Sequence, residues 1–200
     1  MITHTVGLSL GATSSIESGV AVRELNSGKI IYLDKLFSMN DINLFFDNYS
    51  SLKNSCICIS LPWDNTMLDG KWRVHSKQYQ LIHTNEDFLN TDNWMQRFSS
   101  RGCDLFNSLK ESGVDISRFE VYLTRQKLNL YSNYKERSSS DCKFLQNILK
   151  NEYNLHELPN NMMPVAQLEA IVGTILAENK LKNNTKKIFE YKNLNVINIV

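Results

Sequence analysis

An alternation of apolar and polar side chains predicts three short strands at the start of the chain. Residues 6–13, 18–22 and 29–33 place apolar side chains at every second position, and glycine-containing turns separate the three runs. The first run ends in a loop of small residues, whose backbone can approach a phosphate or a metal ion closely. The pattern therefore predicts a three-strand meander with a candidate ligand loop at its first turn.

Helices and further strands alternate along the rest of the chain. Helical spacing of apolar residues marks four segments: 41–52, about 91–110, about 140–153 and the segment after Pro164. Strand patterns mark four others: 55–61, 118–123, 186–191 and 196–200. Asn40 or Asp41 is the predicted cap of the first helix, and Ser139 or Ser140 that of the third. This order indicates an α/β fold. In such folds the functional residues usually lie at the carboxyl ends of the parallel strands.

The length of the chain suits one domain, covering residues 1–200, with a full hydrophobic core. Residues 63–90 have weak periodicity and many polar side chains. We interpret them as a long loop insertion, and long loops in compact domains are often functional.

Charge and hydropathy narrow the classes of partner. The chain has 22 Lys and Arg against 21 Asp and Glu, a formal net charge of +1, so any surface that attracts anions must be local. No apolar run approaches the roughly 18 residues of a membrane span, and no basic segment precedes an apolar one at the N-terminus. We therefore expect a cytoplasmic protein that does not act in the membrane.

The four cysteines are Cys56, Cys58, Cys103 and Cys142. Cys56 and Cys58 lie two apart on a predicted strand and point to the same face, which makes a bridge between them strained. No second pair of cysteines and no neighbouring histidine completes a zinc set. We interpret the cysteines as buried or half-buried thiols of a reducing compartment.

Four short motifs together resemble the ribonuclease H-like superfamily. They are GLSLGA at 7–12, SGVAV at 18–22, ICISLP at 57–62 and LEAIVGTILA at 168–177. Within that superfamily the chain is most similar to the predicted nucleases labelled domain of unknown function 429. The resemblance implies a ribonuclease H-like mixed sheet, in which parallel strands extend a three-strand antiparallel meander and helices cover both faces.

The resemblance also implies where a metal site would lie. Active members of such families carry acidic residues on the first strand, the fourth strand and the late helix, where they hold divalent cations that act on a phosphodiester. The matching positions here are Ser9, Ser60 and Glu169. Two of three carboxylates are thus replaced by neutral hydroxyls, which leaves Glu169 to bind Mg²⁺ or Mn²⁺ weakly at best. The resemblance therefore supports the fold and argues against efficient catalysis.

Other carboxylates offer an alternative, a working metal-dependent nuclease. Asp64 and Asp69 follow the fourth predicted strand, Glu17 follows the first turn, and Glu120 lies within the fifth predicted strand. Asp64 is the most interesting because it stands two residues past Pro62, although a solvated turn aspartate or a cap is the simpler explanation.

Several residues are candidates for binding a phosphorylated ligand. The hydroxyls of Thr13 and Ser14 follow the first strand, and basic residues alternate with aromatic ones in two presumed crevice loops. The candidates in those loops are Lys71, Trp72, Arg73, Arg125 and Lys127, and the second loop continues to Tyr134, Lys135 and Arg137. Lys and Arg neutralise phosphates and aromatic rings stack on bases, but a solvated surface explains the same pattern.

Two functions remain open from the sequence. The first is a degenerate ribonuclease H-like protein that binds nucleic acid or another phosphorylated ligand, or serves as an interaction scaffold. The second is the active nuclease, with Glu169 assisted by Asp64 or Asp69. The apolar strand at 196–200 is either an inner strand or an edge that pairs with a second copy in a homodimer.

Overall fold

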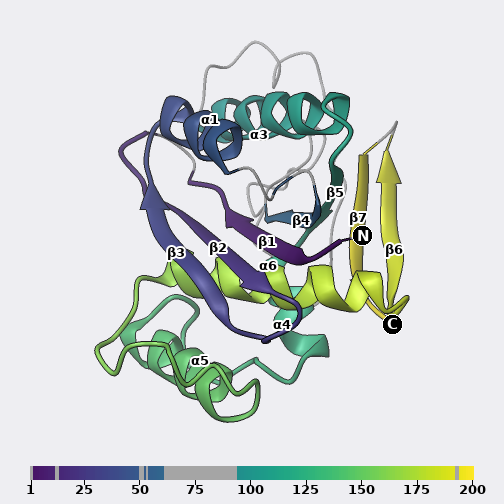
Figure 1. Ribbon diagram of the computed structural model, residues 1–200. Coiled ribbons are helices and arrows are strands. Elements are labelled where there is room, and N and C mark those ends of the chain that lie inside the picture. Colours follow the sequence, from purple (N-terminus) through teal and green to yellow (C-terminus); the bar gives the residue numbers. More distant parts are fainter. Residues whose placement is uncertain (1, 12–13, 50–51, 53, 61–93, 192–193) are drawn as a thin grey trace.

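The computed structural model describes residues 2–11, 14–49, 52, 54–60, 94–191 and 194–200 of the chain. The expected loop insertion at 63–90 lies outside these residues. The described elements form a mixed sheet with helices on both faces (Figure 1).

Seven strands form the sheet in the order β3-β2-β1-β4-β5-β7-β6. Their bounds are β1 His4–Ser9, β2 Ser18–Glu24, β3 Ile30–Leu36, β4 Ser55–Ser60, β5 Asp115–Phe119, β6 Thr185–Tyr191 and β7 Leu194–Ile199. Strands β1, β2 and β3 form the predicted antiparallel meander, and β4, β5 and β7 extend it in parallel with β1. The last strand, β7, is an inner strand, because β6 pairs with it on its outer side.

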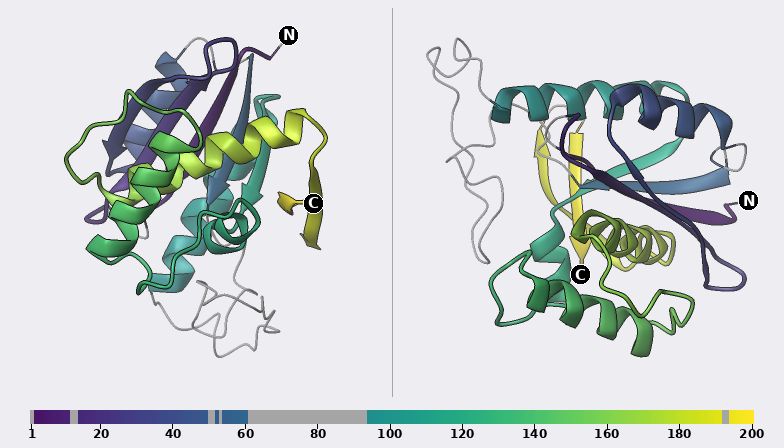
Figure 2. Two further views of the ribbon diagram at one scale, coloured as in Figure 1. Left: turned by 90° about the horizontal axis from the view of Figure 1, so that it is seen from below. Right: turned by 90° about the vertical axis from the view of Figure 1, so that its left-hand side faces the viewer.

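The described residues include five helices: α1 Met39–Asn48, α3 Trp94–Glu111, α4 Val121–Lys127, α5 Ser139–Asn151 and α6 Val165–Leu181. Helices α1 and α3 cover one face, α6 crosses the other, and α5 lies on the far side of α6 (Figure 2). The core is split accordingly: Val6 and Leu8 of β1 belong to the cluster beneath α1 and α3, whereas Cys56 and Cys58 of β4 pack toward α6. The α/β fold class and the mixed sheet are thus confirmed.

Helix α6 packs closely on the sheet because small residues line the contact. A Cβ atom added to Gly7 of β1 would stand 1.8 Å from the carbonyl oxygen of Ala170, and one added to Gly19 of β2 would stand 2.0 Å from that of Ala166. Only glycine permits these approaches. All residues of α6 from Leu168 to Ala177 are buried, so this helix is the core element that places Glu169 against the end of the sheet.

The predicted caps of two helices were wrong by a few residues. Ser38 caps α1 and Ser138 caps α5, in each case by accepting the backbone N–H three residues later. The acidic residues at those later positions, Asp41 and Asp141, suit the first turn of a helix and the positive end of its dipole. Sequence reasoning placed the cap inside the helix because it started from the apolar positions.

The predicted strand 118–123 was also wrong in its second half. Strand β5 ends at Phe119, and Glu120 caps α4 through its Oε2 atom, which accepts the N–H of Leu123 at 2.7 Å. Val121 and Tyr122 are both buried although they are sequence neighbours, which a helix between two packed layers permits and a half-exposed strand does not.

The expectation that the cysteines are buried thiols is confirmed for three of the four. Cys56, Cys58 and Cys142 are free thiols in the interior, and burial raises the pKa of Cys56 to about 12. The side chain of Cys103 lies outside the described residues.

Within the described ranges, no helix has the length and apolarity to cross a bilayer.

Candidate functional site

A polar crevice lies at the carboxyl ends of β1 and β4, on the side covered by α6. Ser9 and Ser60 are the last residues of these neighbouring strands and stand opposite one another in register. Glu169, from the second turn of α6, lines the same small pocket as both serines. The three positions that the resemblance singled out therefore meet, as expected, in one crevice.

The Glu169 carboxylate is buried and accepts hydrogen bonds at both oxygens. Ser9 Oγ donates to its Oε2 at 2.7 Å. Arg137 approaches with a two-pronged contact, Nε to Oε1 at 2.8 Å and Nη2 to Oε2 at 2.6 Å. The Glu169 side chain is 3% exposed and that of Arg137 28%, so this charge-assisted pair forms largely away from water.

Arg137 is held in place from two directions. Its backbone N–H donates to Asp141 Oδ2 at 3.0 Å, and its φ of 59° is in the left-handed region, which costs a residue with a side chain about 1–2 kcal/mol. Asp141 in turn binds both terminal nitrogens of Arg125, at 3.0 and 2.6 Å, and the hydroxyl of Ser132 at 2.7 Å. Burial opposes charge on Asp141, but these partners outweigh it and lower its pKa.

Attraction to Glu169 also governs the charge of Arg137. Burial disfavours the guanidinium ion, yet the neighbouring carboxylate more than compensates and the pKa of Arg137 rises above its ordinary value. The guanidinium is therefore a permanent cation inside the crevice.

Glu120 is a second acidic residue of the crevice. It lies where β5 passes into α4, lines the pocket together with Glu169, and is 6% exposed. Burial raises the pKa of Glu120 to about 8, against hydrogen bonds from the backbone of Leu123 and Tyr122, and repulsion from Glu169 and Glu136 adds to the rise. Glu120 is consequently mostly protonated and neutral at pH 7.

A pair of divalent cations does not fit these residues. The space left in the pocket is about 20 Å³, enough for about one water molecule. At pH 7 the described lining residues carry one negative charge, on Glu169, which Arg137 neutralises. No group of three or more His, Cys, Asp or Glu side chains suited to a metal occurs in the part of the chain that the structure describes.

The other candidate residues do not line the crevice, or lie outside the described residues. Arg125 lies in α4 with no exposed surface and uses its charge on Asp141, which argues against contact with a ligand. Lys127, at the end of α4, and Ser14, in the turn after β1, are exposed. Six candidates lie outside the described residues: Thr13, Asp64, Asp69, Lys71, Trp72 and Arg73.

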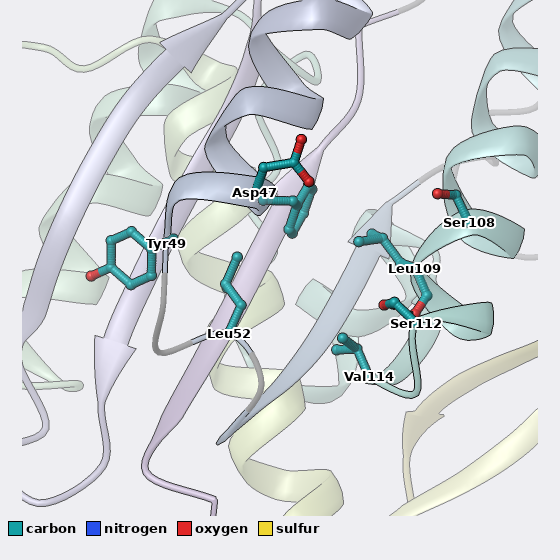
Figure 3. Close-up of a pocket in the computed structure, with 8 residues that line it drawn as sticks. Asp47, Tyr49, Leu52, Ser108, Leu109, Ser112 and Val114 are labelled. Carbon is teal, nitrogen blue, oxygen red and sulfur yellow. Dashed lines mark hydrogen bonds between the residues drawn. The ribbon is translucent and has the colours of Figure 1, made fainter.

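A second hollow lies at the opposite end of the parallel strands. Figure 3 shows Asp47 and Leu52, from the end of α1 and the segment after it, facing Leu109 and Val114 from the end of α3 and the turn that follows. Its volume is about 260 Å³ and most of its lining is apolar. Asp47 is its one charged lining residue among those described, and the serines Ser108 and Ser112 also line it. The hydroxyl of Ser112 is already used, because it donates to the backbone oxygen of Leu109 at 2.7 Å.

Sequence reasoning missed the roles of Arg137 and Glu120. Arg137 appeared only as one basic residue of a polar loop. Glu120 appeared only as one of four alternative carboxylates, on a predicted strand. The Asp at the third position after Ser138 signals a helix start, which would have placed Arg137 in the turn before it. Nothing in the sequence relates that turn to α6, which begins 28 residues after Arg137.

Comparisons with protein-family models, with curated proteins and with solved structures found no match to this chain. Only the fold and the crevice therefore bear on the function of this chain. They define an α/β protein whose mixed sheet is consistent with a ribonuclease H-like layout.

Proposed function

We propose that this chain is a ribonuclease H-like protein without efficient phosphodiester hydrolysis, and that it acts by binding nucleic acid or another phosphorylated ligand. The main evidence against hydrolysis is that both carboxylate oxygens of Glu169 already accept hydrogen bonds, from Arg137 and Ser9. Metal-assisted hydrolysis needs several anionic oxygens open to cations. This crevice offers two hydroxyls, a protonated Glu120 and a neutralised Glu169.

Binding is supported by the segment that leads to Arg137. Tyr134 is 55% exposed and Lys135 is exposed beside it, two residues before the arginine that reaches the crevice. An exposed ring next to a cation is the combination that stacks a base and neutralises its phosphate. Ser14 adds an exposed hydroxyl in the turn that follows β1, at the same end of the sheet.

A cleavage assay tests the first half of the proposal. We expect single-stranded and duplex substrates to survive incubation with Mg²⁺ or Mn²⁺, because no open carboxylate occurs among the described residues that line the crevice. The Glu169→Gln variant, which keeps the shape of the side chain, should give the same background rate as the wild-type chain. Metal-stimulated cleavage that disappears in Glu169→Gln would instead establish the nuclease, with Asp64 or Asp69 as the first candidates for the remaining ligands.

Fluorescence anisotropy with a labelled single-stranded oligonucleotide tests the second half. Replacing Tyr134 by Ala should weaken binding by about 5- to 100-fold, the range that corresponds to one stacked base. The Lys135→Glu variant should weaken binding further at low salt and flatten its dependence on salt concentration.

The matched control is Lys29→Glu, which makes the same change of charge. Lys29 is exposed in the turn between β2 and β3, at the opposite end of the sheet from the crevice. Equal affinities for the Lys135→Glu and Lys29→Glu variants would rule out a specific surface near Arg137.

A further inference from the structure

Arg137 occupies the position of a counter-ion for Glu169. Three donors saturate the near side of the carboxylate, two from the guanidinium and one from Ser9, all between 2.6 and 2.8 Å. A cation that approached Glu169 would have to displace the guanidinium or share the carboxylate with it. Sharing is unfavourable because like charges repel strongly where water is largely excluded.

The backbone conformation of Arg137 orients its guanidinium toward Glu169. The left-handed conformation of Arg137 is held by its N–H bond to Asp141 and by Ser138, the N-cap of α5, which follows it. Asp141 is fixed by its ion pair with Arg125, in which both side chains are at most 3% exposed. A conformation that is costly for a residue with a side chain persists only where its surroundings over-determine it.

The remaining lining would suit a cation once the guanidinium is removed. Ser9, Ser60 and Glu120 line the pocket with Glu169 and supply hydroxyl and carboxyl oxygens. Such oxygens are the ligands that Mn²⁺ and Mg²⁺ prefer. Loss of the Arg137 side chain would both enlarge the space of about 20 Å³ and leave Glu169 with an uncompensated charge.

We infer that Arg137 is a built-in cation that closes the crevice to divalent metal ions by taking their place against Glu169. The inference rests on the same pairing as the proposed loss of hydrolysis and is independent of whether the chain binds nucleic acid. It predicts that loss of the Arg137 charge and loss of the Glu169 charge have opposite effects on ion binding. Removing the cation should open a site for a cation, and removing the anion should open a site for an anion.

Titration calorimetry with Mn²⁺ alone tests the first effect. We expect the Arg137→Gln variant to gain one Mn²⁺ site at least about 10-fold tighter than any site of the wild-type chain, as charge repulsion is relieved. Arg137→Lys keeps the positive charge and should bind Mn²⁺ no better than the wild type. The double variant Arg137→Gln with Glu169→Gln should lose the new site, which assigns it to this crevice.

Thermal unfolding in inorganic phosphate tests the second effect and remains informative if Arg137→Gln does not fold. In Glu169→Gln the guanidinium lacks its counter-charge, so about 10 mM phosphate should raise the Tm by about 3 °C or more relative to the wild type. The double variant should show no such rise.

Equal Mn²⁺ binding by the wild-type chain and a folded Arg137→Gln variant would overturn the inference. So would equal phosphate effects on the wild-type chain and Glu169→Gln. Either result is compatible with an absence of cleavage and an intact affinity for oligonucleotides. Failure of this inference is therefore distinguishable from failure of the proposed function.

Discussion

At the scale of single residues, the crevice combines ionisable groups whose charges depend on one another. Glu120 has a pKa of about 8 because it is buried and because Glu169 and Glu136 repel a second negative charge. Arg137 stays charged because Glu169 attracts it. The same set of residues would behave differently in water, where carboxyl groups of this kind titrate near 4.5.

The raised pKa of Glu120 predicts a dependence of stability on pH. The folded chain holds a proton on Glu120 between pH 4.5 and about 8 that the unfolded chain has already released. Stability therefore contains a contribution that is complete below pH 4.5 and is lost as the pH rises through about 8. Urea unfolding at pH 5, 7 and 9 should show a decline that is steeper in the wild type than in Glu120→Gln, by about 4 kcal/mol in total.

Glu120→Gln is a suitable comparison because an amide oxygen can still accept the N–H of Leu123 at the start of α4. Groups outside the crevice are the same in both proteins, so the difference between the two pH profiles reports Glu120 together with its coupling to Glu169 and Glu136. Parallel profiles would show that Glu120 has an ordinary pKa in the folded state.

At the scale of elements, the contact between α6 and the sheet decides where Glu169 lies. The helix rests on β1 and β2 through Gly7 and Gly19, with its own Ala166 and Ala170 facing them. Close approach of a helix to a sheet increases the dispersion contacts of both. It also brings Glu169 within hydrogen-bond distance of Ser9, two residues along β1 from Gly7.

A methyl group at Gly7 should disrupt this contact. Because the added Cβ atom of Gly7→Ala would stand 1.8 Å from the carbonyl oxygen of Ala170, α6 would have to move away from β1. We expect a loss of about 3 kcal/mol or more, or about 6–12 °C in Tm by differential scanning calorimetry.

The control for Gly7→Ala is Gly113→Asn. Gly113 is exposed after α3 with a φ of 82°, and a Cβ atom added there would meet no atom within 4 Å. Asn tolerates this conformation, so the Tm should fall by less than about 4 °C. A Gly7→Ala variant as stable as Gly113→Asn would contradict the proposed packing constraint.

At the scale of the whole molecule, the two ends of the parallel strands differ in chemistry. The carboxyl ends of β1 and β4 open on the crevice with its ion pair and hydroxyls, whereas the amino ends lie near the largely apolar hollow between α1 and α3. The crossover connections of a parallel sheet bring loops from distant parts of the sequence to the same end. The crevice accordingly unites residues from β1, β4, α6 and the turn before α5.

The sequence by itself determined the strand meander, the buried strand β4, the approximate helices and the meeting of Ser9, Ser60 and Glu169. These features follow from local periodicity and from a resemblance in the order of motifs, both of which can be read along the chain. Strand β5 was predicted at 118–123 but lies at Asp115–Phe119. The prediction ran too far because an apolar neighbour pair such as Val121 and Tyr122 fits a strand or a short buried helix equally well.

Only the tertiary structure decided which charge faces Glu169. Arg137 precedes Glu169 by 32 residues, and the two meet because α5 lies against α6 and its first turn positions the preceding residue. Likewise, Arg125 is basic in any sequence analysis, yet its burial against Asp141 removes it from the surface. Periodicity reports which side of an element faces the core, whereas an ion pair depends on distances between elements that periodicity does not contain.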